Sequence, residues 1–231
     1  MAAGFFFSGW AWAAAALPPL SAAEIVARMV EKNQRRQQLL EGYRVERLYH
    51  LRSELSDKES LMRVQVVFES PATVRFDIRS NEGSGFIATR VWKRIMEAER
   101  DSREPERRRL TAITPENYTF ALQGQEEIRG RLAYVLGVRP LREDPLLFVG
   151  RIWVDAQDFA VARVEGTVSK RPSFWIRKIE IVRNYKKIGP FWLPQRTEGT
   201  VEVLLLGTFW VDVTNGDYRV RLHNTAAGPT Q

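Results

Sequence analysis

The segment Gly150–Pro194 constrains the fold of this chain more than any other part. It reads GRIWVDAQDFAVARVEGTVSKRPSFWIRKIEIVRNYKKIGPFWLP. Runs of β-branched and aromatic residues alternate here with polar turns, a pattern that predicts consecutive strands. The first turn is Asp155-Ala156-Gln157-Asp158, and Gly189-Pro190 forces a later reversal of the chain. We therefore expect an antiparallel meander with strands at Arg151–Val154, Phe159–Val168, Phe174–Tyr185 and Phe191–Val203.

Strand patterns extend over most of the chain. In Thr73–Arg79, Val74, Phe76 and Ile78 alternate with polar residues, as expected for a strand with one buried face. Asn215-Gly216 is a dipeptide typical of a tight hairpin. Further strands are expected at Tyr43–Arg52, Glu59–Glu69, Phe86–Ile95, Tyr118–Gln123, Arg131–Val138, Thr208–Val213 and Asp217–Leu222.

A helix is predicted over Ala22–Leu40. Ile25, Val26 and Met29 recur there near helical spacing, with charged residues on the other face. Ser21-Ala22-Ala23-Glu24 is a capping box, and Gly42 is expected to end the helix as its C-cap. We expect this helix to pack on the sheet; a helix lying on a membrane surface is the alternative.

The charged segment Glu97–Leu110 interrupts the strand rhythm. It predicts a solvated helix or loop, with a short helix at Glu106–Leu110 because proline at 105 can begin one.

These elements predict an α+β fold with a single large antiparallel sheet of about ten or eleven strands, which must curl or close at that size. The run Phe174–Ile181 reads as apolar on both faces, with Trp175 and Ile179 opposite Phe174 and Ile176. A sheet wetted on one face alternates cleanly, so two apolar faces need two covers. Helices are expected on one side, and a ligand, a lid or the curl of the sheet on the other. Aromatic side chains that simply fill a closed barrel are the alternative.

The N-terminal residues predict export. Gly4–Leu20 carries no charge and spans 17 residues, fewer than the ~20 that cross a bilayer. We expect residues 1–20 to be a signal peptide, with cleavage after residue 16 or 23, and the protein to be periplasmic. An uncleaved signal anchor is the alternative, since no basic residue precedes the apolar run. Residues 21–223 are expected to form one domain, and 224–231 a frayed tail.

Composition narrows the classes of function. The chain has no cysteine, so disulfides, thiolate zinc sites, cysteine nucleophiles and a lipid-modified cysteine are excluded. A formal net charge of +7 suggests contact with anionic partners, but a solvated basic surface is the favoured explanation.

We find no catalytic, metal or cofactor motif and expect a protein that is not an enzyme. His50 and His223 have no ligand spacing, and the carboxylates of Asp155 and Asp158 are explained by a hairpin turn. Arg107-Arg108-Arg109 lies among acidic residues without aromatic neighbours, so no nucleic-acid partner is expected.

Three features together resemble a known family: the exported N-terminal helix, the pattern FESPATVRFDI over Phe68–Ile78, and the meander ending in Gly-Pro-Phe-Trp-Leu-Pro. They resemble the outer-membrane lipoprotein-sorting proteins of the LolA, LolB and RseB superfamily, in a divergent branch, most strongly over Ile113–Pro194. In the typical carrier a basic residue precedes the proline of this pattern and helps to hold the lid. Ser70 stands at that position here.

The resemblance implies an open half-barrel with the N-terminal helix and short helices over its concave face. It implies a monomeric periplasmic protein that holds acyl chains of lipoproteins or lipids and carries them toward the outer membrane, with inner- and outer-membrane transport components as partners. The alternative is an RseB-like sensor that passes a lipid signal to a membrane protein. The absence of a second domain after the sheet favours the carrier, and the absence of cysteine excludes a lipid-anchored receptor like LolB.

The ligand is expected to contact one face of successive strands. Alternation along the strands places these apolar side chains on one face. The predicted cavity lining is Val64, Val66, Phe68, Val74, Phe76, Ile78, Trp153, Trp175 and Trp192.

Overall fold

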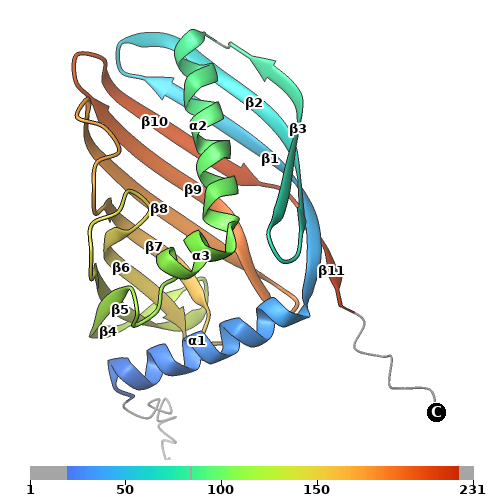
Figure 1. The fold of residues 1–231 in the computed structure, drawn as a ribbon, viewed down its shortest axis with the longest axis vertical. Coiled ribbons are helices and arrows are strands. Elements are labelled where there is room, and N and C mark those ends of the chain that lie inside the picture. Colours follow the sequence, from blue (N-terminus) through green and yellow to red (C-terminus); the bar gives the residue numbers. More distant parts are fainter. Residues whose placement is uncertain (1–19, 84, 224–231) are drawn as a thin grey trace, which may run out of the picture.

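The computed structural model describes residues 20–83 and 85–223. The predicted signal peptide up to residue 19 and the predicted tail at 224–231 lie outside the described residues. The described helices are Ala22–Leu39 (α1), Phe86–Arg103 (α2) and Pro105–Thr111 (α3) (Figure 1). The strands are Leu40–Ser53 (β1), Ser56–Glu69 (β2), Thr73–Glu82 (β3), Tyr118–Ile128 (β4), Arg131–Pro140 (β5), Phe148–Asp155 (β6), Val161–Val168 (β7), Ile176–Ile188 (β8), Phe191–Val203 (β9), Gly207–Asn215 (β10) and Arg219–Leu222 (β11).

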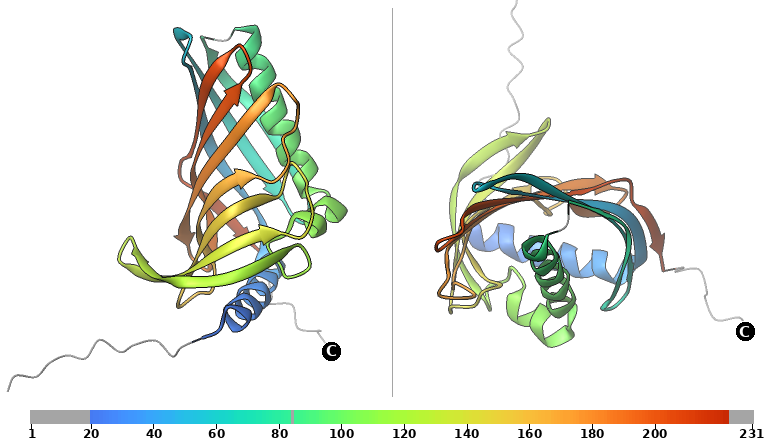
Figure 2. Two further views of the ribbon diagram at one scale, coloured as in Figure 1. Left: turned by 90° about the vertical axis from the view of Figure 1, so that its left-hand side faces the viewer. Right: turned by 90° about the horizontal axis from the view of Figure 1, so that it is seen from above.

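One antiparallel sheet contains all eleven described strands. Their order is β3-β2-β1-β10-β9-β8-β7-β6-β5-β4, with β11 paired to β1 next to β10. The two ends of this order, β3 and β4, do not pair with each other in the described part of the chain, so the sheet stays open. Seen from above, the sheet curves around α1 and α2 (Figure 2). The predicted α+β half-barrel is confirmed.

Helix α1 has the predicted capping box. The Ser21 hydroxyl accepts from the Glu24 amide at 3.2 Å, and the Glu24 carboxylate accepts from the Ser21 amide at 2.8 Å. Its apolar stripe, Ile25, Val26 and Met29, is buried against the β4–β7 half of the sheet. The helix therefore packs on the sheet, as expected, and the membrane-surface alternative is not needed.

Helix α2 corrects the strand predicted at Phe86–Ile95. The aromatic and β-branched residues of that segment suggested a strand, but Ala88, Trp92 and Ile95 recur at helical spacing and pack against the sheet. The helix continues into the charged segment as far as Arg103, which donates to the Tyr43 hydroxyl at 3.0 Å. The short helix predicted after Pro105 is confirmed as α3.

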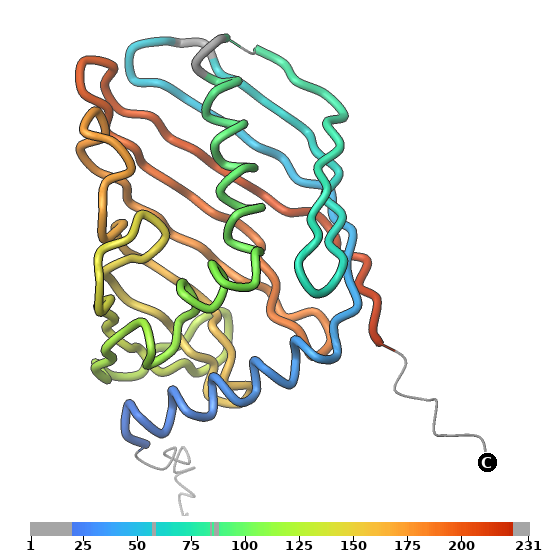
Figure 3. Tube along the Cα trace, in the orientation of Figure 1, coloured from blue at the N-terminus to red at the C-terminus, as the bar shows by residue number. Residues whose placement is uncertain are grey.

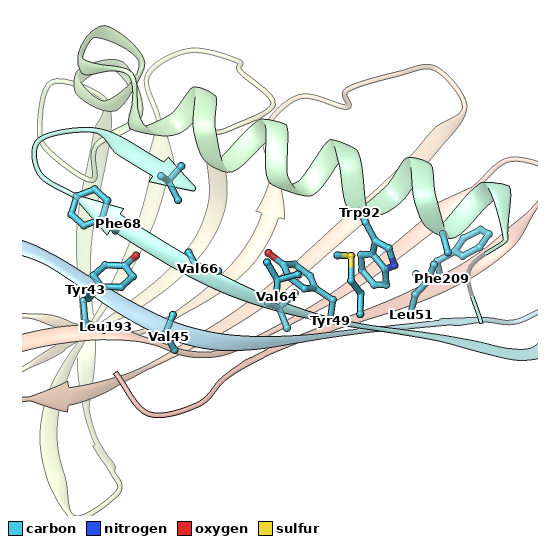
Figure 4. Packing of buried hydrophobic residues seen from close by; sticks show 14 of the residues in the cluster. Tyr43, Val45, Tyr49, Leu51, Val64, Val66, Phe68, Trp92, Leu193 and Phe209 are labelled. Atoms are coloured by element: carbon cyan, nitrogen blue, oxygen red, sulfur yellow. The ribbon is translucent and has the colours of Figure 1, made fainter. Parts of the chain in front are cut away.

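The apolar side chains form two main cores on the concave side, one under α2 and one against α1. Along β1, Tyr43, Val45 and Tyr49 are buried, whereas the alternating Arg44 and Glu46 are exposed on the convex side. The core under α2 contains Tyr43, Val45, Tyr49, Leu51, Met62, Val64, Val66, Phe68, Val74, Ala88, Trp92, Phe191, Leu193, Phe209 and Val213 (Figure 4). The core against α1 contains Ile25, Val26, Met29, Tyr118, Tyr134, Leu136, Val138, Leu147, Ile152, Val154, Ala156, Phe159 and Val164.

The run that reads as apolar on both faces, Phe174–Ile181, is one-sided in the structure. A register shift between Ile176 and Lys178 in β8 absorbs one residue of the strand. Ile176 then pairs with Val203 and Ile179 with Val201, so the isoleucines share one face. Phe174 and Trp175 precede the strand. A bulge, which sequence periodicity does not register, removes the second apolar face.

The dipeptide Asn215-Gly216 does not make a hairpin. β10 and β11 do not pair with each other in the described sheet; both run antiparallel to β1, one after the other along the same edge. The Gly216 amide donates to the Glu46 carbonyl at 2.9 Å, so the chain keeps contact with β1 as it passes. Figure 3 shows the trace continuing from β10 into β11 without reversal.

Gly42, expected as a helix C-cap, lies inside β1. Helix α1 ends at Leu39, and Leu40 already has extended backbone angles. Gly42 pairs with Glu69 in β2, and a Cβ atom at Gly42 would lie 2.4 Å from the carbonyl oxygen of Phe68. The position requires glycine because two backbones approach closely, not because a helix ends there.

We expect Gly42→Ala to lower the free energy of unfolding by about 2 kcal/mol, because the added methyl group pushes β1 away from β2. Gly199→Ala in β9 is the matched control, since the nearest atom to its Cβ would be 3.8 Å away. It should change stability by less than about 1 kcal/mol. Urea unfolding of both variants measures this, and equal losses would contradict the close-approach explanation.

Candidate functional site

Six of the nine residues predicted to contact a ligand form a cross-strand ladder on the concave face. Val64 pairs with Ile78, Val66 with Phe76, and Phe68 with Val74. Val64, Val66, Phe68 and Val74 are buried, Phe76 is half-buried, and Ile78 is 52 % exposed near the end of β3. The sequence thus correctly predicted that these side chains share a face.

Helix α2 covers this ladder. Trp92, 1 % exposed, lies with its ring 5.4 Å from that of Tyr49, and its indole nitrogen donates to the Ser60 hydroxyl at 3.3 Å (Figure 4). Further along the helix, the guanidinium of Arg103 lies 4.5 Å from the centre of the Phe68 ring. The apolar face under α2 is therefore filled by the chain's own side chains.

Beside this covered area, the same face of the sheet continues as a half-buried apolar strip. Val201 pairs with Phe209 of the core and with Ile179 of β8, which places all three on one face. We define the apolar strip by the half-buried residues of β8–β10 on this face, Ile176, Ile179, Ile181, Val201, Val203 and Val211. It connects the core under α2 to solvent.

A charged pair joins α2 to the sheet within this apolar surrounding. Arg47 of β1 bonds to Glu99 of α2 at 2.5 Å, with their side chains 6 % and 19 % exposed. Arg47 also donates to the Asn215 side chain at 2.8 Å and to the Tyr49 hydroxyl at 3.0 Å. Each polar group in this cluster thus has a partner, which a buried charge requires.

The electrostatics of the pair follow from its position. Burial raises the pKa of the Glu99 carboxyl, but the adjacent Arg47 guanidinium, helped by Arg103 and Arg183, outweighs burial and holds that pKa below its usual value. Burial also raises the pKa of the Tyr49 hydroxyl. The pair is therefore charged at neutral pH.

The three tryptophans predicted to contact a ligand lie away from this ladder. Trp153 belongs to a separate cluster with Ala133 and Val135, and its indole nitrogen donates to Glu126 at 2.8 Å. Trp175, in the loop before β8, is 48 % exposed.

Trp192 alternates with Phe191 and Leu193, which are in the core under α2, so it faces the opposite side of the sheet. Its indole nitrogen donates to Asp158 at 3.0 Å. The aromatic residues of the meander are thus divided between the two faces, and Phe191 and Leu193 are the ones that extend the concave core.

Asp155 and Asp158 shape the turn between β6 and β7. Asp155 accepts from Arg131 at 2.6 and 2.8 Å and from the Asp158 amide at 2.7 Å. Asp158 pairs with Lys187 at 2.7 Å. Burial raises the pKa of Asp158, but the bonds from Lys187 and Trp192 lower it below its usual value. Asp155 thus stabilises the turn, and Asp158 joins the turn to β5, β8 and β9 through Arg131, Lys187 and Trp192.

Two pockets lie outside the covered face. One of about 160 Å³ is bounded by the β4–β5 hairpin and by Lys187 and Trp192 of β8 and β9. A groove of about 460 Å³ is lined mainly by exposed charged residues of β1–β3, such as Arg44, Asp77 and Arg79. Neither pocket is lined by a residue of α2.

Among the described residues, no helix is long and apolar enough to cross a membrane. No cluster of three histidine or carboxylate side chains in that part of the chain could hold a metal ion. His50 pairs with Glu59 at 2.7 Å.

Ser70, at the position of the family's basic residue, lies in the turn before β3. Arg108 of α3 donates to the carbonyl of the next residue, Pro71, at 3.2 Å.

Comparison with known proteins gives similarity in structure alone. No family model matches the sequence, and no curated protein matches it. A putative outer membrane lipoprotein-sorting protein domain from Vibrio parahaemolyticus is similar at 14 % identity and TM-score 0.47, covering 89 % of this chain and 95 % of that one. A DUF1329 family protein from Desulfovibrio piger is 12 % identical with TM-score 0.43, covering 90 % and 95 %.

A LolA superfamily protein from Nitrosomonas europaea is 13 % identical with TM-score 0.39, covering 88 % of this chain and 94 % of its own.

The cross-strand neighbours Val66 and Phe76 should respond differently to a carboxylate. Val66→Asp buries the charge in a sealed site and should lower the free energy of unfolding by about 4 kcal/mol. Phe76→Asp should cost only about 2 kcal/mol, because the half-buried position faces Arg100 of α2 and solvent. Thermal and urea unfolding measure both, and a larger loss at Phe76 would show that the edge of the ladder is sealed.

Glu99→Gln should lower the free energy of unfolding by about 3 kcal/mol at neutral pH, because it leaves Arg47 buried without its carboxylate. Since the Glu99 pKa is lowered in the folded protein, its contribution is complete above the ordinary carboxyl pKa of about 4.3 and is lost as pH falls through the lowered value. The stability gap between wild type and variant should therefore shrink below about pH 4.

The matched control is Glu97→Gln on the same helix, whose pair with Lys93 is exposed and should contribute less than about 1 kcal/mol. Urea unfolding from neutral to acidic pH measures both variants. A gap for Glu99→Gln that stays constant with pH would show that ionisation of Glu99 does not stabilise the fold.

Proposed function

We propose that the concave face binds acyl chains of a lipid or lipoprotein when α2 moves away from the sheet. The main support is that the apolar face of β1–β3 is covered by one helix and continues on β8–β10 as the half-buried apolar strip. An acyl chain entering along the strip would meet Val203 and Val201 first and then Phe209 at the border of the core.

The buried pair between Arg47 and Glu99 supports a cover that can be released. A cover that never moved would gain nothing from buried charges, since replacing such a pair by apolar side chains is often neutral or stabilising. When α2 separates from the sheet, both charged groups regain water, which offsets part of the lost attraction. An all-apolar contact offers no such compensation.

The magnitudes favour binding once the helix has moved. Each buried methylene of an acyl chain contributes ~0.8 kcal/mol. About ten buried methylenes therefore contribute about 8 kcal/mol, which offsets part of the free energy needed to move the apolar side chains of α2 off the sheet. Transfer from a bilayer into the same apolar face is nearly neutral, so loading and unloading at membranes would both be accessible.

The proposed role is that of a binding and carrier protein rather than an enzyme, acting in the periplasm as a monomer. The charge-free apolar segment at Gly4–Leu20 supports export. On this proposal, selectivity arises at the rim of the concave face and from the membrane components that exchange cargo with it.

Tethering α2 to the sheet tests the proposal. Arg100 lies with its guanidinium 5.2 Å from the centre of the Phe76 ring, so cysteines at these two positions can be bridged. The chain has no cysteine of its own, so Arg100→Cys with Phe76→Cys reacts only at these sites. We expect a flexible cross-linker with a cleavable disulfide to abolish uptake of a fluorescent fatty acid, and a reductant to restore it.

The same double variant, capped with a monofunctional maleimide, is the matched control and should bind the fatty acid. Uptake that is equal in bridged and capped protein would overturn the proposal that α2 uncovers the site. Absence of uptake in the wild-type and capped proteins would overturn acyl-chain binding itself.

A further inference from the structure

Three turns meet at one end of the sheet, at the upper left of Figure 1. They join β1 to β2, β9 to β10, and β7 to β8. Their adjacency follows from the register, since Val203 pairs with both Gly207 and Ile176. Backbone hydrogen bonds tie them together: the Leu204 amide donates to Trp175 and the Glu54 amide to Thr208, both at 2.8 Å.

Large apolar side chains are exposed on each of these turns. We call them the apolar tip: Leu55, Phe174, Trp175, Leu205 and Leu206. Phe174 is 70 % and Leu205 82 % exposed, and the Phe174 and Trp175 rings contact each other at 4.2 Å between centroids. These side chains lie outside both described cores under the helices.

The backbone of Leu205 is a second indication that this surface contacts a partner. Its φ of 65° lies in the left-handed region, where a leucine is strained and asparagine or glycine is favoured. With 82 % of the residue exposed, the strain is not offset by packing within the chain. A strained residue that presents an apolar side chain to solvent points to a partner outside the fold.

Basic residues flank Phe174 and Trp175 in the loop between β7 and β8. Lys170 and Arg171 precede Phe174, and Arg177 and Lys178 follow Trp175, with no acidic residue between them. Lys178 pairs with Glu180, but none of the ion pairs between described side chains involves Lys170, Arg171 or Arg177. The nearby carboxylate of Glu54 is bonded to the Thr208 amide at 2.7 Å.

We propose that the apolar tip docks on the surface of an anionic phospholipid bilayer. Tryptophan, phenylalanine and leucine enter the boundary between headgroups and acyl chains, while the flanking cations contact headgroup phosphates. Five side chains on projecting turns are far fewer than the roughly 20–30 residues that each partner contributes to a standard protein interface, so a membrane surface fits better than a second protein.

Docking in this orientation also brings the apolar strip to the membrane. Val203, which belongs to the strip, lies at the last pair of β9 next to the turn that carries Leu205 and Leu206. Docking itself does not depend on the proposed acyl binding, because it uses side chains outside the concave face.

Flotation of the protein with vesicles tests the proposal. We compare vesicles of phosphatidylcholine alone with vesicles that also contain phosphatidylglycerol, at low and high salt. Wild-type protein should float with the anionic vesicles at low salt and be released as salt rises. Leu205→Asn should weaken this binding about tenfold, as expected for loss of one inserted leucine, and should raise the melting temperature because asparagine tolerates the left-handed backbone.

Matched controls are Leu222→Asn, on β11, and Arg44→Glu, on the convex side of β1, which should bind as wild type does. Phe174→Ser with Trp175→Ser, and Arg171→Glu with Arg177→Glu, should each abolish binding to anionic vesicles. Equal binding to neutral vesicles, unchanged binding by the tip variants, or a dimer lost on Leu205→Asn in sedimentation velocity would overturn the proposal. Fatty-acid uptake by the same variants, unchanged by tip substitutions, separates this test from that of the proposed function.

Discussion

An open sheet with one apolar face must have that face covered, and the rest of this structure follows from how the cover is made. Along β1 the apolar residues point inward, with Arg47 among them, whereas Arg44 and Glu46 lie on the convex side. Two helices divide the concave side: α1 packs against β4–β7 through Ile25, Val26 and Met29, whereas α2 covers β1–β3. The strands between them, β8–β10, are left half-covered. The chain thus has one core against α1 and another under α2 that borders the half-buried apolar strip.

Helix α2 is held to the sheet by apolar packing and by one ion pair, and exposure to water affects these two contacts differently. Trp92 is buried by apolar packing, which favours the closed arrangement as long as water is the competitor. The Arg47–Glu99 pair instead loses hydration when buried and regains it when exposed. On the proposed function, an apolar ligand would compete directly with the apolar packing of Trp92, while Arg47 and Glu99 would regain water.

Sequence reasoning predicted the fold well because alternation and turn residues carry local information. It placed Val64–Phe68 and Val74–Ile78 on one face, since each strand reads with a period of two. It missed the helix at Phe86–Arg103 because Phe86, Val91 and Trp92 favour strands by propensity, although Ala88, Trp92 and Ile95 have helical spacing.

The ion pair between Arg47 and Glu99 was not visible in the sequence, since 52 residues separate its members. A signal was present all the same: Arg47 interrupts the inward series Tyr43, Val45, Tyr49 and Leu51, and a charge on an apolar face requires a distant partner. Trp192 faces away from the concave core because its neighbours Phe191 and Leu193 are buried in that core. The sequence predicted two apolar faces for β8, but one bulge places its isoleucines on a single face. Face assignments fail wherever a strand gains one residue.

The path of β10 and β11 along β1 has a consequence for how the protein is made. β1 is among the first elements to leave the ribosome, yet one of its edges pairs only with β10 and β11, which leave last. The His223 amide even bonds back to the Leu39 carbonyl at 3.0 Å, where α1 passes into β1. Until the final strands are synthesised, that edge and the apolar face beside it have no intramolecular partner. During synthesis this edge is therefore open to pairing with other chains until β10 and β11 arrive.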